Sequence, residues 1–192
     1  MVVLRFKILV LAMLLGVSSS LAQDSSSVRP LQLKYDLQFG MLAGGQVVNE
    51  NFIYKPGVIG QLGVNAKISS WIYAGLGVGL QSLEEETILP VFLDLKAHFR
   101  EGDRSSFIGL NIGTSSAWSD DYRRVTEFEY EGGFYFSPYY SFQFPLSEKM
   151  NLLVVTGLIH QIGEIELHTE FHEDYDEKFA MDFFTVRAGI RF

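Results

Sequence analysis

Hydrophobic and polar residues alternate with a period of two along most of this chain after residue 30. From Leu31 to Leu42 the odd-numbered positions are apolar, and polar or small residues separate them. A period of two is typical of a β-strand, because successive side chains point to opposite faces. The same alternation predicts seven further strands, at 58–68, 72–81, 91–99, 108–113, 134–144, 151–161 and 184–192. Only the segment 151–161 is apolar on both faces, so the sequence leaves its orientation open.

The connections between these strands alternate in length. Three are short turns, at 69–71, 100–105 and 145–149, and the others are longer and polar, at 43–56, 82–90, 114–132 and 162–180. Outer-membrane barrels have tight periplasmic turns and extended extracellular loops. The pattern therefore predicts an all-β fold over residues 31–192, an eight-stranded antiparallel up-and-down transmembrane β-barrel. An even number of strands returns both ends of the barrel to the periplasm.

The first 22 residues predict a cleaved signal peptide. Arg5 and Lys7 precede an apolar run of ten residues, 8–17, and the small residues Ser20 and Ala22 suit a cleavage site before Gln23. A membrane anchor is the alternative, but a spanning helix needs about 20 apolar residues. Residues 23–30 are then expected to form a flexible periplasmic leader.

Composition narrows the class of protein further. Without Arg5 and Lys7, 13 basic residues remain against 23 acidic ones, so the net charge becomes −10 and nucleic acid is an unsuitable partner. There is no cysteine, so no disulfide holds this exported chain together. Yet 47% of the residues are hydrophobic without a second long apolar run. Strands that cross a lipid bilayer account for both facts.

Alternation alone does not decide whether the apolar face points inward, as in a soluble barrel, or outward into lipid. An eight-stranded barrel has an interior just wide enough for side chains. The polar face here mixes glycines with charges of both signs, which suits a filled lumen in which bulky side chains lie against glycine. We therefore expect a lumen charge network, because buried charges need partners. Its predicted members are Lys34, Asp36, Lys67, Asp94, Lys96, Arg187 and Arg191.

Aromatic residues gather near the short turns, as in the aromatic girdle of a membrane barrel. The predicted girdle consists of Trp71, Tyr73, Phe99, Phe107, Phe144 and Phe192. Ordinary strand aromatics of a soluble sandwich or barrel are the alternative interpretation.

Three segments carry a resemblance to a known family: 89–96 (LPVFLDLK), 132–138 (GGFYFSP) and the ending 187–192 (RAGIRF). They resemble the small outer-membrane β-barrel domain proteins of Bacteroidetes-type bacteria, which are similar in architecture to the OmpA and OmpX barrels. The resemblance implies that a terminal Phe on the lipid face, with alternating apolar residues before it, is read by the barrel-assembly machinery. Here these residues are Ala188, Ile190 and Phe192.

Two groups of residues invite a chemical interpretation. On a continued strand His168, Glu170, His172 and Asp174 share one face. At about 3.3 Å per residue, residues i and i+4 of a strand lie about 13 Å apart, so three of these side chains could not bind one metal ion without a turn. A solvated acidic loop is the simpler interpretation than a metal site. His160, Ser115 and Ser116 invite comparison with outer-membrane hydrolases, but their spacing fixes no mutual geometry and no nucleophile-elbow motif is present.

Two functions remain in consideration. The first is a structural or surface-interaction barrel without an open pore, which presents loops carrying Tyr54, Trp118, Tyr122 and Phe128 to an extracellular ligand or lipopolysaccharide. The second is a membrane-embedded lipid-modifying enzyme, such as a lipid A hydrolase or acyltransferase. We favour the first, a non-enzymatic monomer of the bacterial outer membrane, with membrane lipid and the barrel-assembly machinery as partners and no cofactor.

Overall fold

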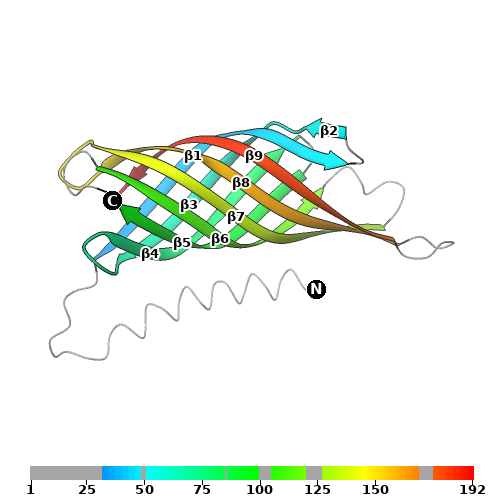
Figure 1. Cartoon of the computed structure of the whole chain (residues 1–192), viewed down its shortest axis with the longest axis horizontal. Helices are drawn as coiled ribbons and strands as arrows, with labels where there is room; N and C mark the ends of the chain where they lie inside the picture. The colour runs from blue at the N-terminus through cyan, green and yellow to red at the C-terminus, as the bar shows by residue number, and fades with distance from the viewer. Residues whose placement is uncertain (1–31, 49–50, 85, 100–104, 120–126, 169–174) are drawn as a thin grey trace, which may run out of the picture. The chain divides into compact units, whose positions relative to one another are not determined.

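The computed structural model describes residues 32–48, 51–84, 86–99, 105–119, 127–168 and 175–192. Nine antiparallel strands make up one sheet that closes into a barrel (Figure 1). They are β1 (Leu33–Val48), β2 (Asn51–Tyr54), β3 (Gly57–Lys67), β4 (Ile72–Leu83), β5 (Glu86–His98), β6 (Ser105–Ser119), β7 (Glu127–Pro145), β8 (Asn151–His168) and β9 (Tyr175–Arg191). The predicted signal peptide (1–22) and leader (23–30) lie outside the described residues and stay predictions.

Eight of these strands form the barrel wall, and β2 extends it as a short hairpin on β1. Each wall strand pairs with its neighbour in sequence, and β1 also pairs with β9, which closes the barrel. Followed once around the wall from Asp36, the register returns to β1 at Gln46, a stagger of ten residues. A stagger of this kind tilts the strands against the barrel axis, as barrel closure requires. The predicted eight-stranded up-and-down barrel is confirmed.

The strands are longer than predicted at one end of the barrel. Most of the predicted long connectors 43–56, 82–90, 114–132 and 162–180 are strand, so describing them as loops was wrong. The β7–β8 ladder runs to the pair Glu127 and His168, and the β8–β9 ladder to Leu167 and Tyr175. In Figure 1 these ends extend away from the C-terminus. Charged residues, other polar residues and glycines interrupt the hydrophobic alternation in these segments, so the pattern did not mark them as strand.

The outer wall of the barrel is apolar and the interior holds the polar residues. Outward-facing Phe39, Met41, Leu93 and Val186 are each more than half exposed, and comparable residues surround the wall. The structure also orients the segment that the sequence left open. On β8, Leu153 is fully buried in the lumen, while its neighbour Leu152 faces outward. A surface of this kind is stable in lipid rather than in water.

No helix within the described ranges is long and apolar enough to cross a membrane.

Candidate functional site

A cluster of buried charges spans the lumen in the half near the short turns. Its centre is Asp36 on β1, which is 2% exposed. The two oxygens of Asp36 accept hydrogen bonds from Arg191 Nε (2.7 Å) and Nη2 (2.8 Å) on the adjacent β9. Lys96 on β5, across the barrel, also donates to Asp36. The cluster therefore ties opposite walls of the barrel together.

A second carboxylate, Asp94, and three uncharged residues complete this cluster. Asp94 accepts a hydrogen bond from the Tyr139 hydroxyl (2.7 Å) and lies 2.9 Å from Lys96 Nζ. The other terminal nitrogen of Arg191, Nη1, donates a hydrogen bond to Gln143 Oε1 (3.0 Å). The Arg191 guanidinium lies over the Phe107 ring, 4.6 Å from the ring centre. Buried charges are stable only when paired and hydrogen-bonded in this way.

Arg187 forms the next layer of the lumen towards the other end. It is 2% exposed and donates to Gln61, whose amide nitrogen donates in turn to the Tyr135 hydroxyl (3.1 Å). The guanidinium also lies over the Tyr139 ring, 5.3 Å from its centre. Glycine makes room for these rings. A Cβ at Gly109 would lie 2.0 Å from Cζ of Tyr139, which no real side chain allows.

The lumen contains hardly any empty space at this level. A cavity of about 10 Å³, room for about one water molecule, lies between Gln38, Asn111 and Arg187. Within the described part of the chain, Gln38 Oε1, Asn111 Oδ1 and Arg187 Nε have no protein partner. Two acceptors and a donor around so small a space suit a single bound water.

Above Arg187, apolar side chains fill the lumen. They form one buried cluster made of Leu42, Ile59, Leu83, Ile88, Phe92, Tyr135, Ile159, Phe179, Met181 and Phe183. The hydrophobic alternation does not predict this plug, because Leu83, Ile88 and Phe179 lie in the segments 82–90 and 162–180, which it predicts to be loops.

Of the seven predicted network residues, the structure brings five together in the buried lumen. These are Asp36, Asp94, Lys96, Arg187 and Arg191. Lys34 and Lys67 lie half-buried near the short turns, where Lys67 Nζ lies 5.9 Å from the centre of the Tyr73 ring. The predicted set did not include Gln61, Gln143, Tyr135 and Tyr139, which are polar residues of the inward faces.

Four of the six residues of the predicted aromatic girdle face outward. Trp71, Phe99, Phe144 and Phe192 are exposed on the outer wall near the short turns. Phe107 is fully buried in the lumen, and Tyr73 packs inside against His98 with ring centres 4.8 Å apart. Placing these two in the girdle was wrong. The alternation that sets Ile108 and Ile72 outward already requires their neighbours to face inward.

The predicted assembly residues lie at the seam of the barrel. Ala188 and Phe192 are exposed on the outer wall, and Ile190 is partly exposed. The backbone of Phe192 exchanges two hydrogen bonds with that of Tyr35 on β1, at 2.9 and 3.2 Å. Whether the assembly machinery reads these residues stays a prediction.

The candidate catalytic residues do not come together. Ser115 faces inward, where its hydroxyl donates to the Gly133 carbonyl (3.3 Å). His160 and Ser116 face outward on β8 and β6, with β7 between them. His160 instead pairs with Asp182 on β9, Nδ1 to Oδ1 at 2.8 Å. No hydrolase triad forms from the three residues.

No group of three or more possible metal ligands occurs among the residues that the structure describes. Of the candidate ligands, His168 ends β8, while Glu170, His172 and Asp174 lie outside the described residues. The metal site therefore stays a prediction that the described residues do not address. Of the predicted loop residues, Tyr54 lies in β2, Trp118 in β6 and Phe128 in β7, and Tyr122 is not described.

The β1–β2 hairpin presents an apolar surface at the end opposite the short turns. Val47, Phe52, Ile53 and Tyr54 are 45 to 60% exposed there. Because Gly45 pairs with Asp182, the residues beyond Gly45 lie further towards this end than the His160–Asp182 pair. In the sheet order β2 has β1 as its neighbour among the described strands, so its other edge carries no ladder.

Solved structures with a similar backbone decide the architecture. The outer membrane protein AlkL, determined by solid-state NMR in lipid bilayers, matches with a TM-score of 0.58 at 13% identity, over 88% of this chain and 93% of AlkL. Neisserial surface protein A matches with a TM-score of 0.59 at 7% identity, over 85% of this chain and 98% of that protein. The chain has the fold of a small outer-membrane β-barrel. The predicted fold and its place in the bacterial outer membrane are confirmed.

At such low identity these two structures establish the fold and not the activity. No family model matches the chain, and no curated protein matches it either. The bacterial group suggested by the sequence resemblance stays a prediction.

Proposed function

We propose that the protein is a surface-interaction barrel that has no open pore and contacts an extracellular partner through its β1–β2 hairpin. The observation that carries this proposal is the exposed apolar hairpin on a filled barrel. We place the hairpin beyond the lipid band because it lies further towards this end of the barrel than the His160–Asp182 pair. Large apolar side chains exposed together in water mark a contact surface, because water does not favour them. The partner is an extracellular ligand or lipopolysaccharide.

The edge of β2 that carries no second ladder among the described strands supports this role at Phe52 to Tyr54. An unpaired strand edge presents backbone N–H and C=O groups that a partner strand can extend, while alternating side chains add specificity. Phe52 and Tyr54 offer the aromatic anchors that interfaces favour. The wall strands hold the hairpin in place, because β1 continues from it into ladders with β3 and β9.

The packed lumen supports the proposal of a closed barrel. Arg191, Arg187 and Tyr135 occupy successive levels of the interior and are each at most 2% exposed. An ion would have to displace several paired charges to pass them. The separation of Ser115 and Ser116 from His160 supports a non-enzymatic role rather than a hydrolase built on these residues. Membrane lipid and the assembly machinery remain the other expected partners of a monomeric barrel.

Cells that display the full-length protein on their surface provide the test. They are screened against immobilised extracellular-matrix proteins, glycans and lipopolysaccharide, beside cells that display Phe52→Ser/Tyr54→Ser. We expect at least one ligand to be retained by the natural protein and lost by the double variant, with equal surface amounts of both. Retention of every ligand by both proteins would contradict a role of the hairpin. Ion conductance of the purified protein in planar bilayers would contradict the closed barrel.

A further inference from the structure

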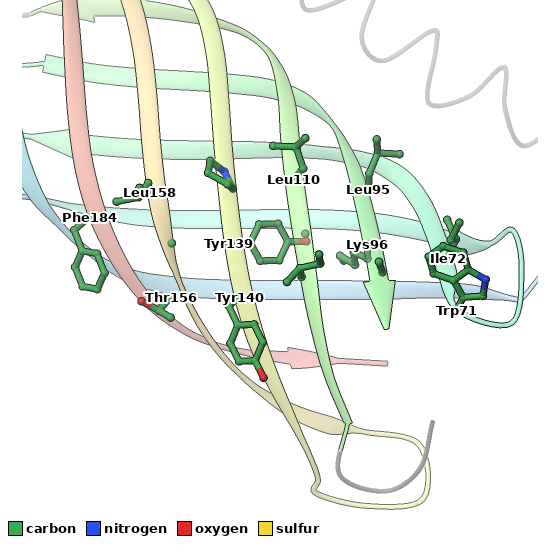
Figure 2. Close-up of a pocket in the computed structure, with 15 residues that line it drawn as sticks. Trp71, Ile72, Leu95, Lys96, Leu110, Tyr139, Tyr140, Thr156, Leu158 and Phe184 are labelled. Atoms are coloured by element: carbon green, nitrogen blue, oxygen red, sulfur yellow. The ribbon is translucent and has the colours of Figure 1, made fainter. Parts of the chain in front are cut away.

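A groove runs obliquely over the outer wall of the barrel, from the short-turn end towards the extracellular end (Figure 2). It has a volume of about 770 Å³, with Trp71 at one end and Leu158 and Phe184 at the other. A second hollow of about 340 Å³ adjoins it and shares Pro138, Leu158 and Phe184. Together the two hollows form one trough, which we call the wall groove.

The local sequence explains why the wall is hollow here. Pro138 lies in the middle of β7 and has no N–H, and the β7–β8 ladder is interrupted between the pairs Phe136–His160 and Tyr139–Gly157. On the outer side, Thr156 is a small residue between large neighbours. Larger side chains, including Phe184 and Tyr140, border the depression. The groove is therefore apolar and long, which suits a hydrocarbon chain.

One polar pair marks the extracellular end of the wall groove. His160 and Asp182 face each other across β8 and β9, and both line the second hollow. Their side chains are 41% and 69% exposed on the outer wall. The next outward residues are Ala180 and then the exposed Lys178 on β9, and the exposed Ile162 on β8. We take the level of Lys178, just beyond the pair, as the boundary at which the polar heads of outer-leaflet lipids begin.

The chemistry of the pair selects the head group. The imidazole Nδ1 lies against the carboxylate and donates to it, so in the neutral ring Nε2 is an acceptor. The Asp182 oxygens are acceptors as well. The pair thus offers acceptors to a ligand that brings O–H or N–H donors. An ester-linked glycerophosphocholine has only acceptors at this depth, and its phosphate meets the Asp182 carboxylate unfavourably.

We propose that the wall groove binds one glycolipid of the outer leaflet. Its acyl chain lies over Pro138 and Leu158, and the hydroxyl and amide groups of an N-acylated sugar donate to His160 and Asp182. The proposal goes beyond the surface-interaction function, because it concerns the outer wall and not the β1–β2 hairpin. Neither proposal depends on the other, so each can fail alone.

The test uses the full mature chain in phosphatidylcholine nanodiscs, to which N-palmitoyl glucosamine is added stepwise. Solution NMR follows the His160 imidazole and the Leu158 methyl groups. We expect saturable shifts at both residues. Asp182→Asn should weaken the apparent affinity about tenfold, because the amide presents a donor where the ligand needs an acceptor. Leu158→Trp, which fills the groove, should abolish saturation at His160.

Two controls keep the outcome decisive. Leu80→Trp places the same side chain on β4 at an outward position that is half exposed and does not line the groove, so it should leave the affinity unchanged. Palmitoyl lysophosphatidylcholine has the same chain length with another head and should give only linear, non-saturating shifts. Equal affinity for both lipids, or an unchanged affinity of Asp182→Asn, would show ordinary lipid contact and overturn the proposal.

Discussion

Replacing Asp36 by Asn tests the role of the lumen cluster. The substitution keeps the shape of the side chain and removes its charge. Both carboxylate oxygens of Asp36 accept from Arg191, and Lys96 donates to the same group. Asp36→Asn therefore leaves two buried cations with Asp94 as the remaining anion of the cluster. In Asp36→Asn an NH₂ group, which is a donor, also replaces one acceptor oxygen and faces the Arg191 guanidinium.

The expected cost follows from these contacts. A hydrogen bond to a charged group contributes about 1.5 to 3 kcal/mol, and breaking a buried ion pair by removing one partner costs about 3 to 5 kcal/mol. Asp94 stays 2.9 Å from Lys96 and limits the loss. We expect the free energy of unfolding to fall by about 3 kcal/mol. Asp182→Asn is the control. It breaks the hydrogen bond between His160 and Asp182, whose side chains are 41% and 69% exposed, so water can replace the lost partner and we expect a loss below about 1 kcal/mol.

Urea unfolding in lipid vesicles, followed by tryptophan fluorescence and by heat-modifiable electrophoretic migration, measures these values. The double variant Asp36→Asn/Lys96→Met removes one charge of each sign. Its loss should be smaller than the sum of the single losses by at least about 1 kcal/mol, because the two residues interact directly. A loss below about 1 kcal/mol for Asp36→Asn, or additive losses in the double variant, would refute the argument.

Three further substitutions, two of them with a matched control variant, test other parts of the barrel. Leu93→Arg places a cation in lipid and should destabilise by about 2 to 4 kcal/mol, whereas Phe52→Arg, beyond the lipid band, should cost at most about 1 kcal/mol in the same urea assay. Equal costs would contradict the position of the bilayer. Gly109→Ala collides with a lumen tyrosine ring and should lower stability by about 1 to 3 kcal/mol, and Gly60→Ala on the outer wall should be neutral within about 0.5 kcal/mol. Phe192→Ser keeps the seam hydrogen bonds but should lower the amount inserted in cells, with near-normal unfolding of the assembled fraction. Wild-type abundance by immunoblot would show that Phe192 is not an assembly signal.

The alternation of hydrophobic residues predicted the wall, because lipid on one side and a packed lumen on the other impose opposite demands on adjacent residues. It predicted both faces of β5 correctly: Leu93 faces outward and its neighbour Asp94 faces inward. It failed on β8 because Leu153, Val155 and Ile159 are apolar in a lumen that was expected to be polar. An apolar plug inside a membrane barrel removes the contrast on which orientation depends.

The charged members of the lumen cluster could be predicted because a buried charge requires a partner. Which of these charged residues contact one another could not be predicted. Asp36 meets Lys96 across 60 positions of sequence and Arg191 across 155, and only the register of all eight wall strands brings them together. Gln61 and Gln143 carry no charge to single them out. The His160–Asp182 pair depends in the same way on the β8–β9 register.

Lipid contact of individual leucine residues tests most directly whether the apolar wall faces the bilayer. Methyl-labelled leucines in the folded protein, embedded in lipid nanodiscs, are examined for NMR cross-peaks to the acyl-chain protons. Leu152 and Leu153 are adjacent on β8 and face opposite sides of the wall. We expect cross-peaks from Leu152, Leu158 and Leu93, and none from Leu153 and Leu42. Cross-peaks from Leu153 without Leu152, or equal cross-peaks from both, would contradict a barrel with a lipid-facing wall and a filled interior.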